Sequence, residues 1–98
     1  FQSCAGRLRL LGDPTRLAVL RHLIEGPKWV WQLVDEFDID PSLLSHHLKK
    51  LREAGLVESV RDGRSIRYQL APGVKVADHV PGLELGECRI AFSAGASA

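Results

Sequence analysis

Residues 40–55 read DPSLLSHHLKKLREAG, a segment with clear signals for both ends of a helix. Asp40 followed by Pro41 is typical of a helix start, because aspartate accepts hydrogen bonds from the first free N–H groups and proline has no N–H to leave unpaired. Gly55 is typical of a helix end. One apolar stripe recurs between them at helical spacing, and it consists of Leu44, His47, Leu48 and Leu51. The segment therefore predicts a helix of about 14 residues, roughly 21 Å long, that buries one face.

Three shorter helices are expected ahead of this one. The first lies in residues 4–11, and the second starts at Asp13-Pro14 with the same cap-and-proline signal. The third spans residues 30–37, whose apolar side chains recur every three or four positions. Only about three residues then lead to Pro41, so the last two helices are expected to form a helix-turn-helix corner.

The period of the sequence changes after the long helix. Residues 56–61 and 65–70 alternate apolar and polar side chains and are expected to be strands, and Asp62-Gly63 between them signals a tight hairpin. Residues 83–92 are expected to form one further strand. The predicted fold class is therefore mainly α with a β-hairpin wing (α+β), a winged helix-turn-helix with an extra C-terminal strand.

The chain divides into four expected segments. Residues 4–72 hold the winged helix-turn-helix domain, and residues 73–92 form a C-terminal extension for dimerisation or sensing. Residues 1–3 are interpreted as the remnant of an expression tag. The small residues 93–98 are expected to form a disordered tail.

The composition excludes several classes of protein. The 98 residues carry 13 Lys+Arg against 12 Asp+Glu, a net charge of +1, so the overall charge selects no partner. The sequence has no apolar run of about 18 residues, which argues against a membrane span. Two cysteines are too few for a disulfide-stapled secreted scaffold, so a cytoplasmic protein is expected. No enzyme is expected, because Ser45 and His46 are adjacent on a helix and do not face each other.

The outward face of the helix that starts at Pro41 carries residue types that bind DNA. A major groove admits a helix whose first turns reach base edges, while cations further along bind phosphates. Arginines on a narrow β tip fit a minor groove or the phosphates beside it. The candidate DNA-binding residues are Ser42, Leu43, Ser45, His46, Lys49, Lys50 and Arg52 on the helix and Arg61, Arg64 and Arg67 on the hairpin. This pattern predicts double-stranded DNA as the partner.

Three blocks of the chain resemble the ArsR/SmtB family of winged-helix repressors. They are LGDPTRL at 11–17, LSHHLKKLREAGLV at 44–57 and DGR at 62–64. The resemblance implies a homodimer that represses transcription by occupying operator DNA and leaves it on binding a metal ion or another inducer. The resemblance also implies which residues face DNA. These are Ser42, Leu43, Ser45 and His46 on the recognition helix and Arg61 and Arg64 on the wing. His47 matches the family pattern but lies on the apolar stripe, where a hydrogen-bonded core histidine is expected.

The metal sites of the family are not matched here. Trp29 and Trp31 stand where its arsenic sensors carry a Cys-x-Cys pair, and tryptophan offers no soft ligand. The Asp-x-His motif of its zinc sensors is also missing, since His79 directly follows an aspartate. Three hypotheses remain for Cys4 and Cys88: they bind a soft transition metal ion, together with His79; they form a redox disulfide; or they are unrelated and the protein has no cofactor.

An acidic segment supports an alternative function. Negative side chains crowd the end of the third helix and the turn after it, at Asp35, Glu36, Asp38 and Asp40. Such a block is unfavourable beside a phosphate backbone. The alternative hypothesis is a winged helix that serves as a protein-interaction module without an inducer site of its own.

Overall fold

The computed structural model describes residues 4–76, 82–85 and 88–92. Its helices and strands are α1 (Cys4–Leu10), α2 (Pro14–Ile24), β1 (Lys28–Trp29), α3 (Val30–Phe37), α4 (Pro41–Glu53), β2 (Val57–Asp62), β3 (Ser65–Leu70), β4 (Lys75–Val76), β5 (Gly82–Glu84) and β6 (Arg89–Ala91). None of the helices within these ranges has the length and apolarity to cross a membrane. The expectations for residues 1–3, residues 93–98 and His79 lie outside the described residues.

Both proline-led helices begin as the sequence predicts. At the start of α2 the Asp13 carboxylate accepts hydrogen bonds from the backbone N–H groups of Thr15 (2.8 Å) and Arg16 (3.1 Å). At the start of α4 the Asp40 carboxylate accepts one from the N–H of Leu43 at 3.3 Å. These bonds pair donors that a helix leaves without a partner, and so they fix where each helix begins.

A tight corner joins α3 to α4. α3 is followed by Asp38, which adopts a left-handed conformation with φ of 48°. Aspartate tolerates this conformation better than most residues, because its short polar side chain bonds locally. The N–H of Ile39 then donates to the carbonyl oxygen of Val34 at 3.5 Å. The predicted helix-turn-helix corner is therefore confirmed.

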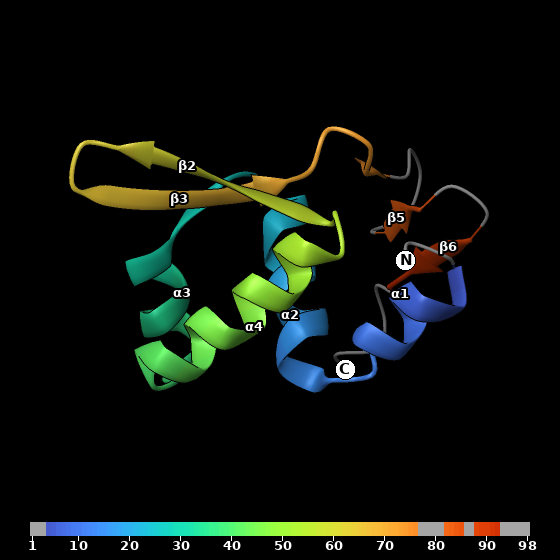
Figure 1. Cartoon of the computed structure of the whole chain (residues 1–98), viewed down its shortest axis with the longest axis horizontal. Helices are drawn as coiled ribbons and strands as arrows, with labels where there is room; N and C mark the ends of the chain where they lie inside the picture. The colour runs from blue at the N-terminus through green and yellow to red at the C-terminus, as the bar shows by residue number, and fades with distance from the viewer. Residues whose placement is uncertain (1–3, 77–81, 86–87, 93–98) are drawn as a thin grey trace.

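The core is built on the buried stripe of α4. Leu44 and Leu51 have no exposed surface, and Leu48 is 1% exposed. They belong to one apolar cluster with Leu20 of α2 and Leu33 of α3. In Figure 1, α4 crosses the middle of the molecule in front of α2, and α3 lies near the N-terminal end of α4. The face of α4 opposite this cluster is left for solvent.

β2 and β3 form the predicted hairpin, which extends to one side of the helices in Figure 1. They pair antiparallel from Val57 opposite Leu70 to Asp62 opposite Ser65. Gly63 takes the first position of the two-residue loop with φ of 64°, where a type II′ turn needs a positive φ. A short strand, β1, pairs with the other edge of β3. The sequence does not predict β1, because two residues are too few to show a period.

The prediction of one C-terminal strand is wrong. Residues 83–92 are divided between β5 and β6, which pair antiparallel. The N–H of Leu85 donates to the carbonyl oxygen of Cys88 at 2.8 Å, where the chain reverses. A Cβ atom at Gly82 would collide with the backbone oxygen of Ile90, so glycine permits the close approach of these strands. β4 pairs with the other edge of β5 and completes a three-stranded sheet.

The second sheet belongs to the same core as the winged helix. Leu83 has no exposed surface and Leu85 is 3% exposed, and both lie in the cluster that contains the α4 leucines. α2 contacts both β3 and β5, so one helix supports both sheets. The predicted α+β architecture, with a hairpin after the helix-turn-helix, is confirmed.

We expect Asp13→Ala to lower the free energy of unfolding by about 1 kcal/mol, because two N–H groups at the start of α2 lose their acceptor. Urea denaturation at neutral pH measures this change. Asp13→Asn is the matched control, since its amide oxygen still accepts a hydrogen bond and most of the stability should remain.

The same carboxylate should make the stability pH-dependent. The pKa of Asp13 lies below its ordinary value of 3.8, mainly because its carboxylate accepts a hydrogen bond from the N–H of Arg16. Burial acts in the opposite direction and raises this pKa. The N–H of Thr15 and the charges of His47 and Arg16 lower it further. A lowered folded-state pKa stabilises the protein above about pH 4, and this contribution disappears as the pH falls through the folded pKa. The difference in free energy of unfolding between wild type and Asp13→Ala should therefore become smaller in acid. A difference that is independent of pH would contradict the lowered pKa of Asp13.

Candidate nucleic-acid interface

The face of α4 opposite the core carries the predicted DNA-binding residues. All of the candidates on this helix are exposed, and they are Ser42, Leu43, Ser45, His46, Lys49, Lys50 and Arg52. The short polar side chains lie in the first turns and the cations in the later ones. This order matches a helix whose N-terminal half meets base edges while its C-terminal half meets phosphates.

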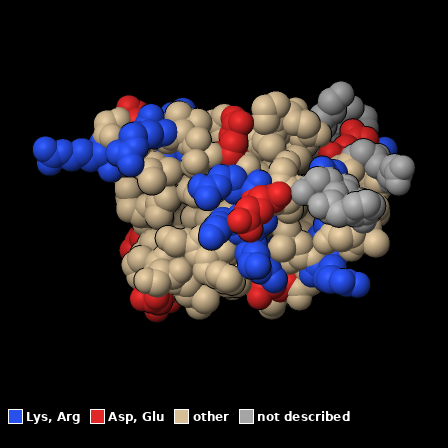
Figure 2. Space-filling view, viewed as in Figure 1, with Lys and Arg blue, Asp and Glu red and all other residues tan. Residues whose placement is uncertain are grey.

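The hairpin adds positive charge at one end of this face. Arg61 and Arg64 are exposed near the turn that joins β2 to β3. Figure 2 shows Lys and Arg side chains gathered over α4 and projecting at the tip of the hairpin, with acidic side chains among them. The small net charge of the chain therefore hides a local concentration of cations on one face, which an anionic partner would meet first.

Unlike Arg61 and Arg64, Arg67 of the predicted DNA-binding set is half-buried. Its guanidinium lies 5.8 Å from the centre of the Trp29 ring, and its buried Nε atom has no hydrogen-bond partner. β1 causes this difference, because it places Trp29 directly opposite Arg67 across the sheet. A contact between Arg67 and DNA stays a prediction, and it would come from a guanidinium that is stacked on an indole.

A groove of about 860 Å³ lies between α3, α4 and β3. Trp31, which is 61% exposed, and Ile66, which is 38% exposed, contribute to its apolar lining. Ser45 of α4 and Arg64 of the hairpin also line it. The helix and the hairpin therefore present two neighbouring surfaces with a hollow between them.

His47 is buried, as predicted, but the hydrogen bond expected for it is not found at Nδ1. This atom is inaccessible, has no hydrogen-bond partner and lies 4.0 Å from Oδ1 of Asp13. The imidazole thus sits beside the cap of α2, where it helps to keep Asp13 ionised. The neighbouring His46 is exposed, and its ring lies edge-on to that of His47 with the two centroids 5.9 Å apart. One of the two adjacent histidines is therefore a core residue and the other a surface residue.

Two of the acidic residues have roles within the fold. Asp40 caps α4, and Oε1 of Glu36 lies 3.4 Å from Nε2 of His22. His22 also lies edge-on to the ring of Phe37, so it links α2 to α3. The sequence does not predict this link, because the residues are far apart along the chain and no spacing rule joins them. Asp35 and Asp38 are exposed.

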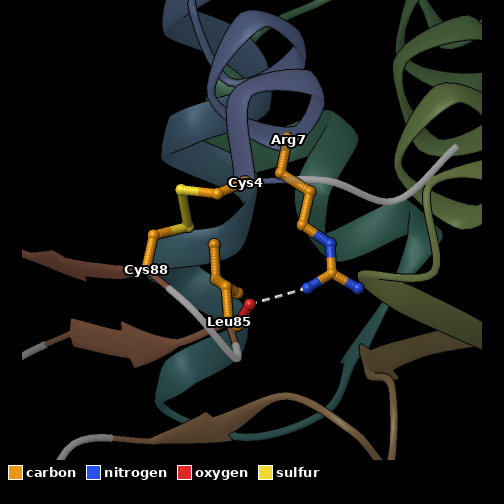
Figure 3. Close-up of a disulfide and its surroundings, with 4 residues drawn as sticks. All are labelled: Cys4, Arg7, Leu85 and Cys88. Atoms are coloured by element: carbon orange, nitrogen blue, oxygen red, sulfur yellow. Dashed lines mark hydrogen bonds between the residues drawn. A yellow bond between two sulfur atoms is a disulfide. The ribbon is translucent and has the colours of Figure 1, made fainter.

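Cys4 and Cys88 form a disulfide that joins α1 to the residue before β6 (Figure 3). Nη1 of Arg7 donates a hydrogen bond to the carbonyl oxygen of Leu85 at 2.9 Å beside it. Of the three hypotheses for the cysteines, the structure supports the disulfide. His79, the third predicted ligand, lies outside the described residues.

The described residues do not fit a metal site. No group of three His, Cys, Asp or Glu side chains able to hold a metal ion occurs among them. The two sulfur atoms are bonded to each other, whereas a metal ion is bound by thiolates. Trp29 and Trp31 provide no ligand in their place.

We expect Cys4→Ser with Cys88→Ser to lower the free energy of unfolding by about 2–4 kcal/mol, because the bond closes a long loop with a sequence separation of 84. Denaturation of the oxidised wild type, the reduced wild type and the variant measures this change. The reduced wild type should match the variant, and the variant should not respond to reductant. Equal stability of all three samples would contradict a structural contribution from this bond.

These features together define a winged helix-turn-helix protein: a corner of two helices, an exposed second helix and a basic hairpin beside it. The match to the bacterial regulatory proteins of the arsR family covers residues 13–59, from the cap of α2 into β2. The chain belongs to this family, and the relatives and solved structures below support the assignment.

Two curated relatives illustrate the extent of the similarity. The HTH-type transcriptional repressor SmtB of Mycobacterium tuberculosis is 42% identical over 64 residues, which are 65% of this chain and 47% of that protein. The probable mercury resistance operon repressor of Streptomyces lividans is 35% identical over 88 residues, which are 90% of this chain and 67% of that protein. The chain thus spans about half the length of the first of these relatives.

The structural comparison agrees with the sequence comparison. The crystal structure of Rv0081 from M. tuberculosis superimposes with a TM-score of 0.66 at 34% sequence identity, and the match covers 68% of each chain. Because the family consists of transcriptional regulators, the prediction that this chain is not an enzyme is confirmed.

Proposed function

We propose that this protein is a transcriptional repressor that binds double-stranded operator DNA as a homodimer in the cytoplasm. The observation that carries this proposal is the exposed face of α4, which holds short polar groups followed by cations beside a basic hairpin. The named repressors among its relatives support the same function.

The proposed complex has α4 in the major groove. A major groove is about 12 Å wide and admits one helix, whose first turns approach the base edges. Ser42, Ser45 and His46 then lie near bases, and Lys49 and Lys50 near phosphates. The hairpin brings Arg61 and Arg64 to the adjoining backbone or minor groove.

A second copy of the chain would supply the second half of the footprint. Two recognition helices about 34–36 Å apart would read a near-palindromic operator. A subunit contact through α1 would cover Leu8, which is 48% exposed in the isolated chain. The resemblance to the family implies the same use of the first helix.

We expect His46→Ala and Lys49→Ala to affect DNA binding in different ways. Loss of a base contact should relax the preference for the operator over unrelated duplexes, at a cost of about 1–3 kcal/mol. Loss of a phosphate contact should weaken binding to all duplexes and reduce the salt slope by about 1. Titration of the operator and a scrambled duplex at several salt concentrations separates these effects.

Ser59→Ala on β2 is the control, because this exposed side chain is outside the predicted DNA-binding set. A wild type that binds no native duplex would argue against the repressor and for the protein-interaction module. If Lys49→Ala changed sequence preference and His46→Ala changed only the salt slope, the two assignments would be wrong.

We further propose that the redox state of the Cys4–Cys88 pair is the signal that this repressor senses. Disulfides in cytosolic proteins are rare and are usually transient or redox-sensing. Reduction by a dithiol transfers two electrons and two protons to the pair, breaks the S–S bond and leaves the reductant as a disulfide. The first turn of α1 then loses its covalent link to the C-terminal sheet, while the Arg7–Leu85 hydrogen bond remains.

We expect reduction to weaken operator binding by about fivefold or more, the lower end of typical coupling between two sites, because α1 is less well ordered without its link. Titrations with oxidised and reduced wild type measure this change. The variant Cys4→Ser with Cys88→Ser should bind like the reduced protein and ignore reductant. Equal affinity of the two wild-type states, with both folded by circular dichroism, would exclude the thiol signal.

A further inference from the structure

Three cationic side chains from three helices meet at a small hollow on one flank of α4. Arg9 of α1, Arg16 of α2 and Lys50 of α4 line it, together with Gly6 and Leu10. Its volume is about 260 Å³, and no carboxylate is among the residues that line it. Arg9 and Lys50 are exposed, and Arg16 is half-buried.

A hydrogen bond to the backbone holds the side chain of Arg16 in place. Its Nε atom donates a hydrogen bond to the carbonyl oxygen of Leu10, the last residue of α1, at 2.8 Å. This bond joins α1 to α2 and holds Arg16 beside the hollow that Arg9 and Lys50 also line. The Asp13 carboxylate interacts with the charge of Arg16, and its Oδ1 accepts the N–H groups of Thr15 and Arg16 at the start of α2.

The hollow lies on the flank of α4 away from the hairpin. Ser45 lines the groove beside the hairpin, whereas Lys50 lines this hollow. Residues five positions apart on a helix are rotated by about 140°, so these two side chains lie on different sides of α4. Figure 1 shows α1 and the hairpin tip at opposite ends of the molecule with α4 between them, and Figure 2 shows cations from the hairpin tip, over α4, to the region of α1.

We propose that the hollow of Arg9, Arg16 and Lys50 binds a backbone phosphate of DNA. Three positive charges beside one hollow repel each other, and a bound anion offsets this electrostatic repulsion. Arginine and lysine are the side chains that bind phosphate most strongly, through charge-assisted hydrogen bonds. This proposal rests on the proposed function and extends its footprint to α1 and α2.

The geometry of a groove explains why a second phosphate site is needed. A helix in the major groove has one phosphate strand on each flank. The hairpin side of α4 meets one strand, and the Arg9–Arg16–Lys50 hollow faces the other. The protein thus holds both strands that border the groove, which fixes the position of α4 without reading sequence.

The test is the salt dependence of operator binding by Arg9→Gln. The slope of log K against log salt is negative, and the loss of one phosphate contact should make it shallower by about 0.9. This change corresponds to about a fivefold loss of affinity at about 0.15 M salt. The preference for the operator over a scrambled duplex should not change. Arg9→Lys should restore most of the slope, because the ammonium still neutralises the phosphate.

Arg21→Gln is the matched control. It removes the same charge from α2, but Arg21 lies over the ring of Phe92 and does not line the hollow. If the wild type binds the operator but Arg9→Gln and Arg21→Gln show the same salt slope as each other, the phosphate site is wrong and the repressor proposal stands. If the wild type binds no duplex, both proposals fail.

Inorganic phosphate at matched ionic strength distinguishes a backbone phosphate from a free one. Wild-type affinity for the operator should not change when millimolar phosphate replaces chloride. Competition by phosphate that Arg9→Gln abolishes would assign the hollow to a free phosphate compound and overturn the backbone site.

Discussion

The core of the protein forms around one buried face of α4. Leu44, Leu48 and Leu51 fill the centre of the core, so the opposite face of the same helix has to remain in solvent. Helical spacing then determines which side chains appear there. The proposed DNA-reading face is a direct consequence of this packing, since no rotation of α4 would bury its leucines and hide Lys49 as well.

The C-terminal sheet and α1 extend this arrangement to the other end of the molecule. Leu83 and Leu85 enter the same core, and the Cys4–Cys88 disulfide holds the first turn of α1 against the sheet. Arg9 lies on the same short helix as Cys4. A thiol pair far from α4 in the sequence is therefore connected, through one helix, to a cation that lines the flank of α4.

Several features could be predicted because they depend on neighbours in the sequence. The Asp-Pro caps, the α4 stripe and the glycine turn of the hairpin are of this kind. The contact between Arg67 and Trp29 could not be predicted, because β1, which brings the two together, is too short to leave a pattern. The sequence alone predicts one C-terminal strand, because nothing local to these residues reveals that β5 and β6 pair with each other.

Capping and helical period are local properties, so the residues of α4 predict where this helix begins, which of its faces is apolar and which polar groups lie on the other face. The disulfide between Cys4 and Cys88 and the hollow lined by Arg9, Arg16 and Lys50 are instead known from the folded structure. Those contacts join residues from separate elements, and their distances depend on how α1, α2 and the C-terminal sheet pack around the shared core.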